Sequence, residues 1–331
     1  MTTVAHAAIV TPGRCGLYET TRELVAAERA EGIDARIVDP RPDERFHVGS
    51  EDRGVPIADM AWAVTADLIV SHSGHDKTPL AETDQPILVA AHGRPISTFI
   101  MEREGGAPAY SYHAARSRQP RYKACITFWQ EYLPYFRDFW GKKPVYTVPA
   151  TVDLDHWCPG PTDYDFAGRK GEYNVVMTDP WSRRDVTLLP LVHAFNLFRE
   201  ESPGARLHIY ALDGNDRGIG ALKSFLGDSL GVVQGWATDL RRVYRAADML
   251  ITPHRIATRS IREATACGLQ VVSGVNAHPE DIEEFADAMA TRTIYPIDTR
   301  ANAERRFSMK AAGEAMASIV AAHARQELAH A

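Results

Sequence analysis

The chain has 331 residues, of which 45% are hydrophobic and 24% are charged, a globular composition long enough for two hydrophobic cores. Its net charge of −6 and isoelectric point of about 6.1 exclude a chain-wide positive field that would draw it to nucleic acid or anionic membranes. There is no signal-peptide pattern and no apolar run of the ~20 residues that span a bilayer. Its four cysteines stand singly, without metal-ligand spacing, so we expect a cytoplasmic protein with reduced thiols: Cys15, Cys125, Cys158 and Cys267.

Short apolar strands alternate with amphipathic helices along the first half, which predicts a parallel sheet with crossover helices. The predicted strands are 6–11, 35–38, 67–71 and 86–91, and the predicted helix is 19–31. Segment 94–143 is predicted to mix helix and strand. It is locally basic, with nine Lys or Arg against four Asp or Glu.

The second half continues the alternation after a proline-rich connector at 144–161. The predicted strands are 173–177, 205–211, 232–235 and 248–252, and the predicted helices are 186–200, 219–226, 240–246 and 280–289. We therefore expect two doubly wound α/β domains, 1–155 and 156–300. Residues 301–331 are predicted to form one long helix with one apolar face: Phe307, Met316, Ile319 and Val320.

The most informative segment is 247–274. A buried strand runs into a Pro-His-Arg turn, and a helix then begins at Thr258 to Ser260 and closes at Gly268 before a second buried strand. Such a helix start presents unpaired N–H groups and a partial positive charge, which suits phosphate. Glu263, one turn further on, is placed to accept hydrogen bonds from ribose hydroxyls. The segment predicts a pocket for a nucleoside diphosphate.

Residues Glu263 to Ser273, EATACGLQVVS, resemble the signature of the retaining family 4 nucleotide-sugar glycosyltransferases, with Gln270 in place of proline. The resemblance implies a GT-B fold: two Rossmann-like domains with a cleft between them, the first for the acceptor and the second for the nucleotide sugar. It also implies a last helix that packs towards the first domain. The implied reaction moves a sugar to an acceptor hydroxyl, with retention and without metal or cofactor. The co-substrate would be a nucleotide-diphosphate sugar, and a UDP-sugar is the first expectation.

The match fails at the first acidic position of the signature, which falls on Arg255. In the family this acid contacts hydroxyls of the donor sugar. Arg255 indicates either an acidic donor sugar such as a uronic acid, or a shift of its side chain to phosphate.

The resemblance also assigns candidate site residues. Gly16, in the glycine-bearing loop after the first strand, would lie against the donor diphosphate. Arg183 and Arg184 would offset charge on the departing diphosphate, because guanidinium groups bind phosphate in two-pronged fashion. His92, which ends a strand, would lie near the transferred sugar. The catalytic candidates are thus His92, Arg183 and Arg184, and the donor-binding candidates are Gly16, Arg255, Thr258, Arg259, Ser260 and Glu263.

His72 and His75 are further candidates, on the acceptor side, because ligands of open parallel sheets bind beyond the carboxyl ends of strands. The other acceptor-side candidates are Arg94, which would assist His92, and Trp129, which lies in the aromatic segment 94–143. A simpler explanation for each histidine is a hydrogen bond to its own loop.

Two short sequences that resemble metal-binding motifs have structural explanations. Asp153 and Asp155 have Asp-x-Asp form but fall in the connector, and 213–216 resembles the start of a calcium loop that no downstream Glu completes. We therefore expect no metal site.

Segment 94–143 holds eleven of the 29 aromatic residues. The commoner explanation is a helix over 128–140 that buries an aromatic face. The alternative is that cations and aromatic rings bind a nucleic-acid acceptor, a hydroxymethylated base in DNA.

Two other functions fit the same pattern. A nucleotide-sugar 2-epimerase shares the phosphate-binding chemistry but needs no acceptor, and a non-catalytic nucleotide-sugar-binding relative would tolerate Arg255. The sequence does not define the base, the sugar, the acceptor or the oligomeric state.

Overall fold

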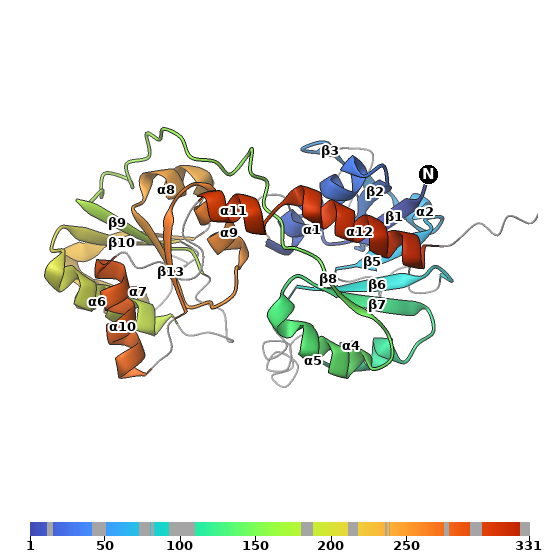
Figure 1. Cartoon of the computed structure of the whole chain (residues 1–331). Coiled ribbons are helices and arrows are strands. Elements are labelled where there is room, and N and C mark those ends of the chain that lie inside the picture. Colours follow the sequence, from blue (N-terminus) through green and yellow to red (C-terminus); the bar gives the residue numbers. More distant parts are fainter. Residues whose placement is uncertain are drawn as a thin grey trace, which may run out of the picture. The chain divides into compact units, whose positions relative to one another are not determined.

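The computed structural model describes residues 1–11, 16–41, 51–72, 80, 83–92, 110–179, 188–210, 218–235, 237, 239–274, 278–291 and 300–324 (Figure 1). The chain divides into two compact units. The first comprises Met1–Thr151 together with Phe307–Ala331, and the second comprises Val152–Arg306. Each contains one largely parallel sheet with helices packed on it, so the predicted fold class is confirmed.

The sheet of the first unit has the order β3-β4-β2-β1-β5-β6-β7-β8. Its strands are β1 (Thr3–Ala7), β2 (Asp34–Val38), β3 (Glu51–Asp52), β4 (Val55–Ala58), β5 (Leu68–Ser71), β6 (Ile87–Ala91), β7 (Tyr122–Thr127) and β8 (Val145–Thr147). Among these strands only β3 is antiparallel, because the chain reverses into β4 through Arg53 and Gly54, with φ of 49° and 79°. The period of the sequence did not predict this short hairpin.

Helices cover both faces of this sheet. They are α1 (Gly16–Ala30), α2 (Met60–Ala63), α4 (Tyr110–Ser117), α5 (Leu133–Trp140) and α12 (Met309–His323). Helix α12 runs alongside α1 (Figure 1), and both pack on the face that carries Val4, Leu68 and Leu88. Helix α5 covers the opposite face with Phe136 and Trp140.

Two helix predictions were wrong in extent. The predicted helix over 128–140 is a 3-10 turn at Gln130–Tyr132 followed by α5, in which Pro134 occupies the first turn, where its missing N–H leaves no bond unmade. The predicted single helix over 301–331 is two helices, α11 (Arg300–Arg306) and α12. The second begins because the side chain of Ser308 caps it, accepting from the N–H of Ala311 at 3.3 Å.

The second unit has a parallel sheet with the order β11-β10-β9-β12-β13. The strands are β9 (Tyr173–Met177), β10 (Ala205–Tyr210), β11 (Leu230–Gln234), β12 (Met249–Thr252) and β13 (Gln270–Ser273). The helices are α6 (Leu189–Glu201), α7 (Gly218–Leu226), α8 (Leu240–Ala246), α9 (Arg259–Ala266), α10 (Pro279–Ala290) and α11. Helices α6, α7 and α10 bury one face of the sheet.

In both sheets the strand order reverses beside the first strand of the unit. The reversal lies between β1 and β5 in the first unit and between β9 and β12 in the second. Loops leave such a point in opposite directions, which opens a crevice at the carboxyl ends of the two strands, where open α/β sheets bind ligands. Within the described part of the chain, every helix is too short or too polar to cross a membrane.

Candidate functional site

By the strand order, the crevice expected in the second unit lies at the carboxyl ends of β9 and β12. Asp179 follows β9 and His254 follows β12, with exposed fractions of only 3% and 1%. Asp179 Oδ1 lies 3.0 Å from His254 Nε2, but among the described residues neither Asp179 Oδ2 nor either ring nitrogen of His254 has a hydrogen bond of good geometry. Because buried polar atoms are normally hydrogen-bonded, these atoms mark a place where a polar ligand fits. Neither residue was predicted from the sequence.

Helix α9 begins at this crevice. Its N-cap, Thr258, has φ of −56° and ψ of 170°, yet its side chain makes no cap hydrogen bond, and its Oγ1 is buried without a partner in the described residues. The first-turn N–H groups of α9 are therefore not satisfied by the side chain that usually satisfies them. A helix start of this kind suits an anion.

Glu263 and Arg259 form an ion pair one turn apart on α9, through Arg259 Nε and Glu263 Oε1, and both side chains are largely buried. Tyr244 of α8 lies in the same cluster, with its hydroxyl 3.3 Å from Thr178 Oγ1. Burial first, and then the charge of Glu263, raise the pKa of Tyr244 well above its usual value, so it stays a neutral phenol. The structure thus brings two predicted donor-binding residues together and adds Tyr244.

Arg255 is exposed and lies at the ends of β12 and β13. Its Nε donates to the carbonyl of Gly274 at 3.3 Å. Gly274 has φ of +96°, and a Cβ there would lie 3.0 Å from Arg255 Cγ, so glycine makes room for the arginine. Arg255 therefore braces two strand ends while its charge stays at the surface.

In the first unit, the structure joins His92 to His72. His72 Nδ1 lies 2.7 Å from His92 Nε2, and the ring of His92 packs against Phe128 at 4.7 Å between centroids. Burial, followed by the charges of His92 and His6, lowers the pKa of His72 well below its usual value. His6, which was not predicted from the sequence, joins this pair: its Nδ1 lies 2.9 Å from His72 Nε2.

The remaining predicted site residues are Gly16, Trp129 and four residues outside the described part of the chain. Gly16 begins α1, and its carbonyl accepts from Thr20 Oγ1 at 2.8 Å. Trp129 is half-buried against the core of the first unit, beside Phe128 and Tyr132. Four predicted residues lie outside the described residues: His75, Arg94, Arg183 and Arg184.

The aromatic segment serves mainly as core. Phe128, Phe136 and Trp140 are at most 5% exposed, whereas Tyr135 is exposed. The rings that a flipped base would need for stacking are thus largely committed to packing. Of the two sequences that resemble metal-binding motifs, Asp153 accepts from the N–H of His156 at 3.0 Å and so caps a turn in the connector, and 213–216 lies outside the described residues.

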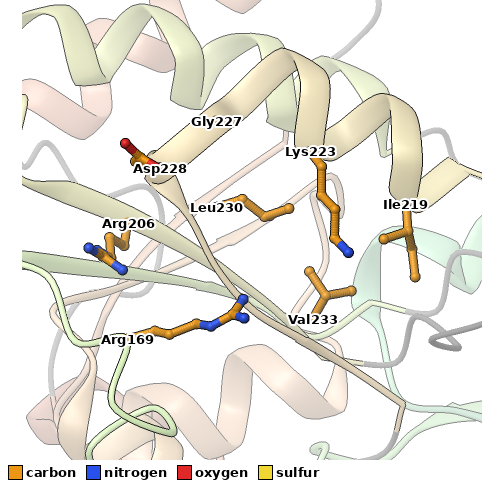
Figure 2. Close-up of a pocket in the computed structure, with 8 residues that line it drawn as sticks. All are labelled: Arg169, Arg206, Ile219, Lys223, Gly227, Asp228, Leu230 and Val233. Atoms are coloured by element: carbon orange, nitrogen blue, oxygen red, sulfur yellow. The ribbon is translucent and has the colours of Figure 1, made fainter.

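A cavity of about 490 Å³ lies elsewhere in the second unit, along the edge strand β11 (Figure 2). Arg169 Nη1 donates to the carbonyl of Gly231 in that strand at 3.0 Å, and none of the predicted site residues lines the cavity. Cations along an edge strand protect it from pairing with another chain. The lining residues are Arg169, Arg206, Ile219, Lys223, Gly227, Asp228, Leu230 and Val233.

Comparison with known proteins identifies the fold. No family model and no curated protein matches the sequence. A glycosyltransferase from Rickettsia africae matches 96% of this chain and 97% of its own, with a TM-score of 0.62 and 13% identity. WaaG, a glycosyltransferase of lipopolysaccharide biosynthesis, matches 96% of this chain and 99% of its own, with a TM-score of 0.60 and 16% identity.

A protein assigned as a UDP-N-acetylglucosamine 2-epimerase, from Listeria monocytogenes, matches 97% of this chain and 96% of its own, with a TM-score of 0.57 and 12% identity. At these identities the matches establish the fold alone. The chain has the GT-B fold.

Proposed function

We propose that the chain is a glycosyltransferase that moves a sugar from a nucleotide-diphosphate sugar to an acceptor hydroxyl. The first donor that we propose is a UDP-sugar. The observation that carries the proposal is the start of α9, which lacks its side-chain cap and stands at the point where the strand order reverses. Phosphate fits such a helix start. The Arg259–Glu263 pair beside it supplies one cation for phosphate and one carboxylate for ribose hydroxyls.

Sugar transfer requires the bond between the anomeric carbon and the diphosphate to break. Negative charge then grows on the leaving diphosphate, and fixed N–H groups and guanidinium groups stabilise it most strongly where water is excluded. The first turn of α9 and Arg259 supply such groups, and we assign the same role to Arg183 and Arg184 from the sequence resemblance. These protein groups replace a metal ion in the proposal, and the anomeric configuration is retained.

The polar atoms of Asp179 and His254 extend the donor site. Both side chains are almost fully buried at the crevice and have hydrogen-bonding atoms to offer. Hydroxyl groups of the donor suit them, because a hydroxyl both donates and accepts. Arg255, at the position of the family's sugar-binding acid, is proposed to select a donor with an acidic sugar.

Calorimetric titration with UDP tests the donor site. Glu263→Gln keeps the shape of the side chain but removes the charge that would hold the ribose, so the affinity for UDP should fall about tenfold, the effect of one charge-assisted hydrogen bond. Glu304→Gln is the control, because Arg300 and Glu304 form a more exposed i, i+4 pair of the same residue types on α11, with Arg300 Nε 2.7 Å from Glu304 Oε1. Equal affinity in the wild type and both variants would contradict the proposal.

A nucleotide-sugar 2-epimerase is the second candidate, because the Listeria protein assigned that activity shares the fold over nearly the whole chain. An epimerase converts its UDP-sugar without any acceptor. Incubation of the protein with UDP-N-acetylglucosamine alone, followed by chromatography of the sugar, separates the two. Release of UDP that depends on an added acceptor supports transfer, and formation of the epimeric sugar supports the alternative.

A further inference from the structure

A row of three imidazoles, two of them buried, crosses the face of the first sheet that α1 covers. His6 lies in β1, His72 follows β5 and His92 follows β6, and these three strands are adjacent. His6 Nδ1 lies 2.9 Å from His72 Nε2, and His72 Nδ1 lies 2.7 Å from His92 Nε2. At the other end, His6 Nε2 lies 3.0 Å from Oε2 of Glu28 in α1. These four residues, the histidine chain, connect a buried carboxylate to the edge of the sheet.

The histidine chain climbs towards the carboxyl edge in equal steps. The register pairs His6 with Val70 of β5, so His72 stands two residues nearer to that edge. The register between β5 and β6 places His92 two residues nearer again. The step from His6 to His72 crosses the point where the strand order reverses, and His92 stands where ligands of such sheets bind.

Proton counting fixes the state of each ring. Glu28 and His6 are fully buried and His72 is 8% exposed. A neutral imidazole has one N–H, so it must donate on one side and accept on the other. With Glu28 ionised, His6 donates through Nε2 to the carboxylate, and His72 and His92 must likewise donate through Nε2. Nδ1 of His92 is then an acceptor.

We propose that Glu28, His6 and His72 are positioning residues that hold His92 with Nε2 protonated and take up the proton that His92 Nδ1 receives. When Nδ1 of His92 gains a proton, its Nε2 proton passes to His72 Nδ1. The Nε2 proton of His72 passes to His6 Nδ1, and the Nε2 proton of His6 passes to Glu28. The net charge of the histidine chain changes from −1 to 0, and Glu28 ends as a neutral carboxylic acid.

The role in sugar transfer rests on the proposed function. The proton comes from the acceptor hydroxyl as its oxygen bonds to the anomeric carbon and the bond to the diphosphate breaks. The proton then returns along the histidine chain in the reverse order and passes from His92 Nδ1 to the released diphosphate or to water. The imidazole of His92 acts as general base, and the buried carboxylate of Glu28 is the final acceptor of the proton.

Other charges on the covering helices are engaged elsewhere in the described structure. On α1, Glu23 accepts from Thr151 Oγ1 at 3.1 Å, and Arg22 pairs with Glu19 at 3.3 Å. The buried residues of α12 carry no charge: Ala312, Gly313, Met316, Ile319 and Val320. Phe128, which packs on His92 from the end of β7, carries none either. Glu28, by contrast, contacts His6 directly, through Oε2 and Nε2.

Nitrogen NMR of the full chain labelled with ¹⁵N-histidine tests the histidine chain without any donor. His6, His72 and His92 should all show protonated Nε2 and unprotonated Nδ1 at pH 7. In Glu28→Gln, the pH at which the chain takes up its proton should fall by about one unit or more, because the nearby negative charge is lost. Glu23→Gln, an equally buried carboxylate on the same helix, should leave it unchanged. Protonated Nδ1 on His72, or equal shifts of the pH of proton uptake in both variants, would overturn the proposed role of the histidine chain.

The pH profile of UDP release tests its role in transfer. In Glu28→Gln the acid limb of kcat/KM should move to lower pH by the shift that NMR measures, a change that a loss of packing would not cause. A normal NMR result with an unmoved limb would overturn the role in transfer. If the wild type turns over no UDP-sugar, the proposed function fails, and the tautomers and the proton uptake are still decided by NMR.

Discussion

Gly313→Ala should destabilise the protein although alanine favours helices. A Cβ at Gly313 in α12 would lie 2.7 Å from the carbonyl oxygen of Ala27 in α1 and 3.1 Å from its carbonyl carbon. Both are backbone atoms, so the helices must separate, at a cost of about 1–3 kcal/mol for an overpacked contact. The helix propensity of alanine returns about 1 kcal/mol. The net loss is therefore about 1 kcal/mol.

Gly220→Ala is the matched control. Gly220 lies in α7, and a Cβ there would have nothing within 4 Å, so the substitution should stabilise by about 0.5–1 kcal/mol. Urea unfolding followed by circular dichroism gives both free energies, and hydrogen exchange of peptides from α1 and α7 locates each change. If Gly313→Ala stabilised as much as Gly220→Ala, the close packing of α12 on α1 would be wrong.

Three further predictions concern pH, metal and donor. His113 accepts a hydrogen bond from Trp140 Nε1 at 3.2 Å, and burial lowers its pKa from 6.5 to about 4. The contribution of the neutral ring to stability is therefore complete above pH 6.5 and is lost as the pH falls through 4. Urea unfolding should therefore show up to about 3 kcal/mol less stability at low pH, at 1.36 kcal/mol per pKa unit, and His113→Gln should flatten this dependence; an unchanged slope would contradict it. EDTA should leave UDP release intact, and a strict requirement for Mg²⁺ or Mn²⁺ would refute the metal-independent mechanism. Arg255→Glu should reduce the thermal stabilisation given by UDP-glucuronate more than that given by UDP-glucose, and equal effects would dismiss the selection of an acidic sugar.

The sequence predicted the regular elements best where apolar runs are bounded by clear breaks. Strand β9 and helix α8 have the predicted limits, 173–177 and 240–246. The hairpin of β3 and β4 was missed because two short strands give no period. The tail was predicted as one helix because the residues on both sides of Ser308 have a helical pattern, and the cap at Ser308 that divides them was not recognised.

The candidate sites were predictable only where residues are close in sequence. Arg259 and Glu263 meet because they are one helical turn apart. The pairs His6–Glu28 and Asp179–His254 depend on how strands and helices align after folding, which no local pattern encodes. A polar residue inside an apolar strand, such as His6 in β1, was the available signal.

The central claim is that the diphosphate of the donor binds at the start of α9, and a crystal structure of the protein with UDP tests it most directly. We expect the phosphates at the N–H groups that follow Thr258 and the ribose within hydrogen-bond distance of Glu263. UDP bound instead along β11, among Arg169, Arg206 and Lys223, would contradict the account.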